Sequence, residues 1–381
     1  MSAEGLHVLL VSASVGSGHD QAAKAVAAGI ERWCPAARVE IVDFMGLENS
    51  YVNTVLKEAY LKVIDVSPNL YDLVYRWTQM PRRYIPVQSL VARAMKRAML
   101  RLYRQYSPDL VICTHPFPLS AAAYLKKTYK LQVPLVGVMT DFSVHPLWVS
   151  REVTSYFVAT KAMRQELITQ GIAPWRIHAT GIPIQPSFSE VVDGKKVRKE
   201  LGLDPSLSTV LFMGGGLGLG PIDEAVKAIS QISRLQMIVV AGKNEALKKR
   251  LDIVARFSDQ RMAVVGYTKR IGELMAAADV LVTKPGALTL SEAMACGLPM
   301  VLYSTLPGQE MENASFCVNH GAAVQVEDME ALPGVISHLL RRPEKLAALK
   351  RSSEALGRKD SADSVAKVIY ELMKTRLVAG V

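Results

Sequence analysis

A histidine stands at a glycine-rich turn near the start of the chain. The stretch SVGSGHDQAAKAV, residues 14–26, follows the apolar run HVLLVSA and leads into an alanine-rich segment. An imidazole titrates near pH ~6.5 and can accept a proton at neutral pH. Because Gly16 and Gly18 leave room for an acceptor molecule, His19 is a candidate general base. The alternative is that His19 caps or packs the turn.

The same turn could instead bind a nucleotide. Gly16-x-Gly18 follows a strand pattern and Asp43 ends the next one, as in dinucleotide-binding folds. The third glycine of that pattern is replaced by Gln21, and the sequence has no GxxxxGK[ST] motif. We therefore expect neither a nicotinamide or flavin site nor a P-loop.

The second half of the chain contains a candidate anion-binding turn within TKPGALTLSEAMACGLPMVLYSTLPGQEMEN, residues 283–313. A strand pattern ends at Lys284, and the small residues that follow leave the amide groups of a helix start bare. Such a site stabilises an anion by up to about 2 kcal/mol. Glu292, one turn further, can accept hydrogen bonds from both hydroxyls of a ribose. Gln309 and Glu310, on a later loop, suit the hydroxyls of a hexose.

The elements that must position these residues alternate between apolar strands and helices. The expected strands are HVLLVSA, RVEIVDF, DLVICTH, PLVGVMT and YFVAT in the first half, then TVLFMGG, QMIVVAG, MAVVGY, VLVTK and PMVLYS. Continuous apolar strands separated by helices predict an α/β fold of parallel sheets covered on both faces. We expect two doubly wound, Rossmann-like domains with an interdomain cleft at the carboxyl ends of their strands.

Domain boundaries follow from composition. The proline-containing stretch 184–206 is the expected linker. It separates an N-terminal domain, 1–184, from a C-terminal domain, 206–355. Residues 356–381 form an expected final helix that packs back on the N-terminal domain.

Composition indicates a globular protein of 381 residues with a net charge of +10. No apolar run reaches the ~20 residues that span a bilayer, and the first apolar stretch has no basic leader. The four cysteines are scattered and form no CxxC pair, which is typical of a reduced, cytoplasmic protein.

A basic segment, residues 73–108, holds eight Lys or Arg and no acid. Arg93, Arg97 and Arg101 share one helix face at four-residue spacing, and apolar residues including Leu90, Val91, Ala94 and Met95 occupy the other. A basic amphipathic helix of this kind can lie on anionic lipid. Alternatively, it is a surface helix whose apolar side packs on its own domain.

The motifs together resemble a known family. KPGALTLSEAMACGLPMVLYSTLPGQE resembles the donor-binding half of the glycosyltransferases that include monogalactosyldiacylglycerol synthases, processive diacylglycerol glucosyltransferases and the peptidoglycan GlcNAc-transferase. SVGSGHDQAAKAV, TDFSVHPLW and YFVATKAMRQELITQGIAPWRIHATGIPI look like the acceptor half of the diacylglycerol enzymes. The resemblance covers nearly the whole chain. It implies a GT-B fold, a UDP-sugar donor, a diacylglycerol acceptor and inversion at the anomeric carbon.

The resemblance also implies roles for individual residues. His19 is the implied base or a critical acceptor-site residue, and the implied donor-binding residues are Gly215, Gly216, Leu217, Gly266, Tyr267, Thr268, Gly286, Ala287, Leu288, Thr289, Glu292, Gln309 and Glu310. His115, Asp141 and His145 are candidates on the acceptor side, beside Gly16 and Gly18, although fixing of their own loops would explain them equally well. Relatives commonly have glycine where this sequence has Ser17, which affects acceptor positioning.

The expected reaction is a single displacement. His19 removes a proton from the 3-hydroxyl of diacylglycerol, the oxygen attacks C1 of UDP-glucose or UDP-galactose, and a β-glycoside forms. No metal or other cofactor is expected, because no Asp-x-Asp motif or metal-ligand spacing occurs. A lipid acceptor favours peripheral attachment to the inner face of the cell membrane, through Arg82, Arg83, Arg93, Lys96, Arg97 and Arg101 with Trp77, Tyr84 and Ile85. No nucleic-acid-binding module is apparent.

Three alternatives share this architecture: a UDP-GlcNAc-dependent transferase with another lipid acceptor, a UDP-GlcNAc 2-epimerase, and a UDP-sugar-binding regulator without turnover. An epimerase would form its product from UDP-GlcNAc alone, and a regulator would leave every donor intact.

Overall fold

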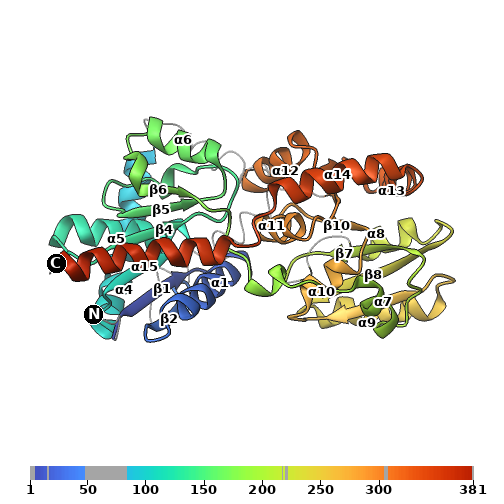
Figure 1. The fold of residues 1–381 in the computed structure, drawn as a ribbon, viewed down its shortest axis with the longest axis horizontal. Coiled ribbons are helices and arrows are strands. Elements are labelled where there is room, and N and C mark those ends of the chain that lie inside the picture. Colours follow the sequence, from blue (N-terminus) through green and yellow to red (C-terminus); the bar gives the residue numbers. More distant parts are fainter. Residues whose placement is uncertain are drawn as a thin grey trace. The chain divides into compact units, whose positions relative to one another are not determined.

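The chain folds into two compact units in a computed structural model that describes residues 5–14, 17–47, 84–216, 218, 222–303 and 308–379 (Figure 1). The first unit comprises Met1–Pro186, Pro307–Gln309 and Lys359–Val381. The second comprises Ser187–Leu306 and Glu310–Arg358. Each unit is built around one six-stranded sheet, and all pairings in both sheets are parallel. The prediction of two doubly wound sheets is therefore confirmed.

The first sheet has the order β2-β1-β3-β4-β5-β6. Its strands are β1 His7–Ser12, β2 Arg38–Asp43, β3 Leu110–Cys113, β4 Leu135–Val138, β5 Ser155–Val158 and β6 Ile177–Ala179. The helices of this unit are α1 Ser17–Trp33, α4 Tyr84–Tyr106, α5 Pro116–Tyr129, α6 Lys161–Thr169 and α15 Ser361–Ala379. Every residue of β3, β4 and β5 is buried, as expected for strands covered on both faces.

The C-terminal helix α15 packs on α1 (Figure 1). A Cβ atom on Gly29 of α1 would lie 2.6 Å from the carbonyl oxygen of Ala362, so only glycine allows this approach. Val365 and Ile369 join the core cluster that includes Ile30. The chain therefore returns to its first unit after passing through the second.

The second sheet has the order β12-β11-β10-β7-β8-β9. Its strands are β7 Ser208–Met213, β8 Leu235–Gly242, β9 Met262–Gly266, β10 Val280–Thr283, β11 Met300–Leu302 and β12 Ala323–Gln325. The helices are α7 Gly194–Glu200, α8 Ile222–Ile229, α9 Glu245–Phe257, α10 Ile271–Ala276, α11 Ala287–Ala295, α12 Gln309–Asn319, α13 Leu332–Leu340 and α14 Pro343–Leu356. This strand order is that of a Rossmann fold.

Each sheet has one point where the strand order reverses. In the first sheet it lies between β1 and β3, and in the second between β7 and β10. Ligands of open α/β sheets bind beyond the carboxyl ends of the strands at such points. The SVGSGH turn follows β1, and the KPGA turn follows β10, so the topology places both candidate motifs where ligands bind.

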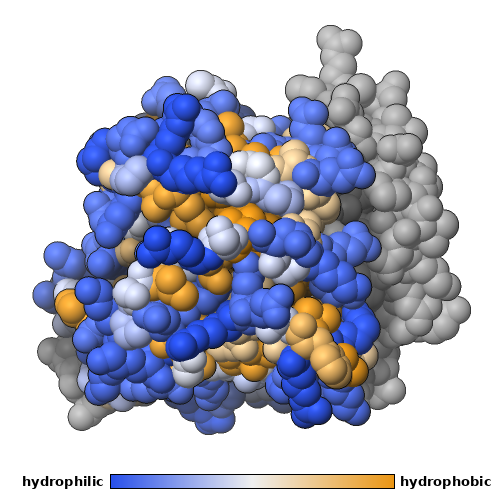
Figure 2. All heavy atoms as spheres, turned by 90° about the vertical axis from the view of Figure 1, so that its right-hand side faces the viewer, coloured by the Kyte–Doolittle hydropathy of each residue, from blue (hydrophilic) through white to orange (hydrophobic). Residues whose placement is uncertain are grey.

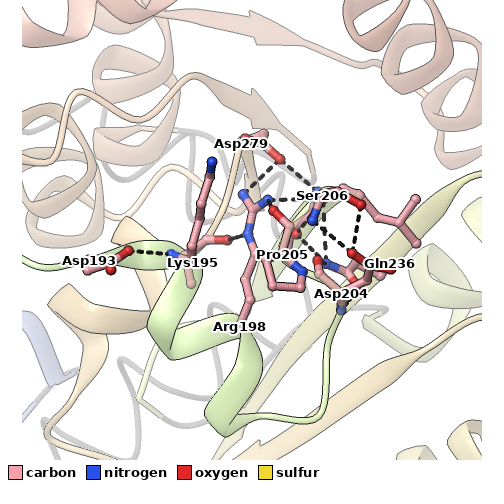
Figure 3. A network of polar contacts seen from close by, with 11 residues as sticks. Asp193, Lys195, Arg198, Asp204, Pro205, Ser206, Gln236 and Asp279 are labelled. Carbon is pink, nitrogen blue, oxygen red and sulfur yellow. Dashed lines mark hydrogen bonds and ion pairs between the residues drawn. The ribbon is translucent and has the colours of Figure 1, made fainter.

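The stretch expected to be a linker instead contains α7, which packs on α10. The side chain of Arg198, on α7, is only 11% exposed. Figure 3 shows its place in a network of polar contacts. Its guanidinium donates to the carbonyl oxygens of Ala277 at 2.7 Å and Leu207 at 3.0 Å, and pairs with Asp279 at 3.0 Å. Asp279 also accepts from the backbone amide of Thr209 at 2.8 Å. The second unit thus begins near residue 187, about twenty residues earlier than composition suggested.

Replacing Arg198 with methionine is expected to lower the free energy of unfolding by about 3 kcal/mol, because buried carbonyl and carboxylate acceptors lose their donor. Urea denaturation followed by circular dichroism measures the effect. Arg250→Met is the matched control, because its pair with Asp223 is 56% and 28% exposed. The control should cost less than about 1 kcal/mol. Equal stability of the two variants would contradict the structural role of Arg198.

The face shown in Figure 2 is mainly hydrophilic, with hydrophobic residues in small separate groups. Large hydrophobic side chains that stand exposed include Ile253 and Phe257 on α9, at 57% and 86% exposure. None of the described helices is long and apolar enough to cross a membrane.

Candidate functional site

The first part of the candidate site lies at the carboxyl end of β1. Two carboxylates accept hydrogen bonds from serines there. Asp43 accepts from the amide and hydroxyl of Ser14 at 2.9 and 2.6 Å, and Asp20 accepts from the hydroxyl of Ser12. Asp43, the residue that could have bound a ribose in a dinucleotide fold, is therefore occupied in holding this loop.

His19 lies in the first turn of α1 and reaches the strand beside β1. Its Nδ1 is 2.9 Å from the carbonyl oxygen of Thr114 and 2.8 Å from Oγ1 of Thr140. A carbonyl oxygen can only accept, so in the neutral ring Nδ1 carries the hydrogen and Nε2 carries the lone pair. This assignment of the tautomer makes Nε2 the atom of His19 that can accept a proton.

Two further histidines lie close by, each at the start of a helix. His115 precedes α5, and its Nδ1 accepts from the amide of Phe117 at 3.1 Å. His145 precedes the 3-10 turn η1, Pro146–Trp148, and its Nδ1 accepts from the amide of Leu147 at 3.2 Å. Both are N-caps, so the loop-fixing interpretation describes one of their roles.

Burial keeps these two capping histidines neutral. It lowers the pKa of His145 to about 4. The pKa of His115 is lowered well below its usual range, first by burial and then by the neighbouring His19 and His145. The ring of His115 stands edge-to-face to that of His19, with centroids 4.6 Å apart. With Nδ1 accepting, each neutral capping ring carries its proton on Nε2, so both can act only as donors there.

The other residues predicted on the acceptor side are Asp141, Gly18 and Gly16. Among the described contacts, Thr140 reaches the ring of His19, whereas Asp141 lies half-buried one residue further along. Gly18 lies in the first turn of α1, directly before His19. Gly16 falls outside the described residues.

The second part of the candidate site begins with the loop after β7. Gly215 adopts φ +73° and accepts from the amide of Gly218 at 3.0 Å, and Gly216 accepts from Lys243 at 3.1 Å. A Cβ atom on Gly218 would lie 2.1 Å from the carbonyl oxygen of Ala241, so a side chain cannot fit there. The loop is thereby held against the end of β8. Leu217, also predicted to bind donor, lies outside the described residues.

The KPGA turn starts α11 without a side-chain cap. Gly286 is the N-cap residue, and a Cβ atom there would meet nothing within 4 Å. The amides of Ala287, Leu288 and Thr289 therefore form an open helix start that suits an anion. Glu292 follows on the same helix, half-buried. Burial raises its pKa from the ordinary 4.5 to about 8.

The two predicted hexose-binding residues open α12. Gln309 and Glu310 stand in its first turn, where the helix dipole favours a carboxylate. Glu310 forms an ion pair with Lys284, the residue directly after β10, at 3.0 Å. The amide of Asn313 donates to the carbonyl oxygen of Pro285 at 3.4 Å. The first turns of α12 are thus tied to the KPGA turn at two points.

The predicted uracil-binding segment, Gly266, Tyr267 and Thr268, follows β9. Tyr267 is 50% exposed, and the ammonium of Lys243 lies 5.4 Å from its ring centroid. Thr268 Oγ1 accepts from the amide of Arg270 at 3.0 Å, which starts the turn into α10. The segment therefore stands at the carboxyl edge of the second sheet.

The basic segment forms α4, and its apolar side packs on its own unit. Met95, Met99 and Leu102 belong to the same core cluster as Leu119 and Leu125 of α5. Ala94, expected on that side, is exposed. The apolar face is thus covered, and the face that remains consists of Arg93, Arg97, Arg101 and Arg104, with Lys96 half-buried. Arg82, Arg83 and Trp77 lie outside the described residues, as do the side chains of Tyr84 and Ile85.

In the described part of the chain, no three His, Cys, Asp or Glu side chains gather as a metal site would require. The prediction of a reaction without a metal stays a prediction.

Three residues of the candidate site, Thr114, Thr140 and Lys284, were not identified from the sequence. Thr114 and Thr140, which hold His19, each follow a buried strand, but they come close to it only through the strand order β1-β3-β4. Lys284 was noted only as the end of a strand. Its position directly before a predicted anion site was a signal that could have identified it.

Two family profiles match the chain. That of monogalactosyldiacylglycerol (MGDG) synthase matches residues 19–184, and that of the glycosyltransferase family 28 C-terminal domain matches residues 209–365. A processive diacylglycerol beta-glucosyltransferase from Bacillus pumilus is 33% identical over 368 residues, covering 96% of this chain and 94% of the relative.

Solved structures support the same architecture. MurG from Acinetobacter baumannii superposes with a TM-score of 0.62 at 14% identity, covering 96% of this chain and 99% of that one. Anabaena Alr3699/HepE in complex with UDP-glucose superposes with a TM-score of 0.56 at 16% identity, covering 97% and 100%. These likenesses confirm the predicted GT-B fold.

Proposed function

The chain belongs to the glycosyltransferase family that contains the processive diacylglycerol beta-glucosyltransferases, and from this premise we propose that it transfers a hexose from a UDP-sugar to the 3-hydroxyl of diacylglycerol. One observation carries the proposal: a relative of that name matches this chain at 33% identity over 96% of its length. The donor in this proposal is UDP-glucose or UDP-galactose, and the product is a β-glycosyldiacylglycerol.

The geometry of His19 supports its role as the base. With Nδ1 held by Thr114 and Thr140, the lone pair on Nε2 can accept the proton of the acceptor hydroxyl. The hydroxyl oxygen then attacks C1 of the hexose from the face opposite the diphosphate, which inverts the anomeric carbon. The neutral rings of His115 and His145 leave His19 as the proton acceptor among these three histidines.

Segments that follow strands of the second sheet supply the donor site in this proposal. The diphosphate binds the bare amides at 286–289, which stabilise the negative charge that builds on the departing UDP. Glu292 accepts hydrogen bonds from the ribose hydroxyls, and Gln309 with Glu310 contacts the hexose. Backbone groups at Gly266–Thr268 bind the uracil. The proposed charge stabilisation uses amide groups, so activity is expected to survive EDTA.

Product analysis tests the function. The protein is incubated separately with UDP-glucose, UDP-galactose and UDP-GlcNAc, with diacylglycerol in vesicles containing phosphatidylglycerol, and lipids are separated by chromatography. A β-hexosyldiacylglycerol from one UDP-hexose is expected. A new sugar nucleotide formed without lipid would indicate an epimerase instead. Transfer only from UDP-GlcNAc to another lipid, or donors left intact with every lipid, would also contradict the proposal.

The exposed arginines of α4 support attachment to anionic lipid at the inner face of the cell membrane. No described acid pairs with Arg93, Arg97 or Arg101, so these like charges repel one another until an anionic surface neutralises them. Since the apolar face of α4 is packed on α5, attachment through this helix is electrostatic.

Charge reversal of these three arginines to glutamate is expected to weaken binding to phosphatidylglycerol vesicles by at least about 100-fold, since each basic residue near the surface contributes about 1 kcal/mol. Vesicle sedimentation measures the binding. The control reverses three exposed charges of the second unit, Arg341, Arg342 and Lys350. If both triple variants bind like the wild type, α4 is not the attachment surface.

A further inference from the structure

Lys284 occupies a position between the two binding elements of the second unit. It follows β10 directly and precedes the open start of α11. Its backbone carbonyl accepts from the amide of Gly286 at 2.8 Å and from Thr283 Oγ1 at 3.1 Å, which fixes the point from which the side chain starts.

The side chain of Lys284 runs along the loop after β7 to the first turn of α12. Its Cε lies 3.7 Å from the point where a Cβ atom on Gly215 would stand. Its ammonium lies 3.0 Å from Oε1 of Glu310. The ammonium therefore sits at the reversal of strand order between β7 and β10, beside the glycine-containing loop after β7 and the open start of α11.

The ion pair is sheltered from water, because the two side chains are 26% and 18% exposed. A further polar group of this neighbourhood is the hydroxyl of Tyr303, which is buried and has no hydrogen-bond partner among the described residues. Its pKa is raised, mainly by burial and also by the charge of Glu310. A partly buried pair of this kind keeps more of its Coulomb attraction than a surface pair does.

A diphosphate entering this region meets the carboxylate of Glu310, which lies beside the Lys284 ammonium. Like charges at short range raise the free energy of binding. The ammonium of Lys284 offsets that repulsion by pairing with Glu310, and it has further N–H donors that can bind the diphosphate. Lysine suits this role because its ammonium is a compact charge with three donors on a flexible stem.

We propose that Lys284 binds the diphosphate of the sugar nucleotide through its ammonium and, through its ion pair with Glu310, couples diphosphate binding to hexose binding. This inference rests on the proposed function. When the bond from C1 to the β-phosphate oxygen breaks, the electron pair stays on that oxygen. Lys284 keeps its proton and neutralises the new charge, while the proton of the acceptor passes to His19.

Calorimetric titration of Lys284→Met with UDP, UMP and uridine tests the contact with the diphosphate. We expect about 30-fold weaker binding of UDP, a loss of no more than about threefold for UMP, and no change for uridine, as for the removal of one charge-assisted contact. Lys284→Arg keeps the charge and should retain most of the affinity. Lys350→Met, an exposed lysine of α14, is the matched control and should bind UDP like the wild type.

Glu310→Gln tests the coupling. It removes the carboxylate while leaving the ammonium, so UDP should bind as tightly as to the wild type or more tightly. The effect of Lys284→Met on UDP-glucose should then be smaller in the Glu310→Gln background than alone. Additive effects of the two substitutions would contradict the coupling.

The titrations contain no lipid and therefore separate this inference from the proposed function. Wild-type binding of UDP with undiminished binding by Lys284→Met would overturn the role of Lys284 and leave the function standing. Equal losses for UDP and uridine would also overturn it, since the damage would then not be at the diphosphate. A wild type that does not bind UDP would overturn the proposed donor itself. Thermal unfolding of each variant confirms that it is folded.

Discussion

Replacing His19 with alanine is expected to lower kcat for hexose transfer about 1,000-fold, within the range of about 10² to 10⁴ that general-base catalysis contributes. The reason is the tautomer set by Thr114 and Thr140, which leaves the proton-accepting lone pair on Nε2. The dissociation constant for UDP should stay within about twofold, because the proposed donor-binding residues follow strands of the second sheet, whereas His19 follows β1 of the first.

Steady-state kinetics with diacylglycerol vesicles measure the first quantity and calorimetry the second. His19→Gln keeps a polar side chain but removes the proton acceptor, because an amide can accept a hydrogen bond but does not take up a proton at neutral pH. Its kcat should be as low as that of the alanine variant. His320→Ala is the control, since this exposed histidine directly follows α12, and its Nδ1 lies 2.8 Å from the Phe316 carbonyl oxygen. Normal kcat in His19→Gln would rule out proton transfer to His19.

Most of the fold could be predicted from hydrophobic patterning. Ten strands were expected and each corresponds to a strand of the structure. The two that patterning missed, β6 and β12, have three residues each and lie at the edges of their sheets. Such a strand is too short to show a periodic signal, and its pairing depends on a neighbour that is distant in sequence.

The linker illustrates a different limit. Residues 184–206 are rich in proline and charge, which is typical of a linker, yet they contain α7. What holds α7 is the contact of Arg198 with Asp279, 81 residues away in the sequence. Local composition cannot reveal a partner at that distance, so the boundary was placed too late.

In the candidate site, too, the sequence revealed local motifs but not the contacts between residues that are distant in the chain. The motif residues could be named from the sequence, because a glycine turn before a helix is a local signal. Their partners could not, since the hydrogen bonds of His19 join residues 95 and 121 positions apart. Thr140, which reaches the ring of His19, was not a candidate from the sequence, whereas the neighbouring Asp141 was.

A site that must bind charge is costly to maintain without its ligand, and Glu292 makes this measurable. Its pKa of about 8 in the folded chain exceeds the ordinary 4.5. Between these two pH values the folded chain keeps a proton that the unfolded chain has released. Stability therefore falls as the pH rises through this window. Glutamine mimics the protonated form, so Glu292→Gln should be more stable than the wild type above pH 8, by at most about 5 kcal/mol. Below pH 4.5 the difference should vanish.

The affinity for UDP should change with pH in the opposite direction to the stability. Ribose hydroxyls donate more strongly to an ionised carboxylate than to an acid or an amide, so UDP binding favours the ionised form of Glu292. Affinity of the wild type should rise with pH up to about 8, whereas that of Glu292→Gln should stay flat and be about 30-fold weaker at pH 8.5, the loss typical of a charge-assisted contact. Urea denaturation and calorimetry between pH 6 and 9 measure the two effects. Glu330→Gln, an exposed carboxylate, should change neither.

If Glu292→Gln gains stability at high pH but binds UDP like the wild type, the carboxylate is merely buried and the ribose lies elsewhere. Loss of affinity without the gain in stability would mean that Glu292 is already ionised in the empty site.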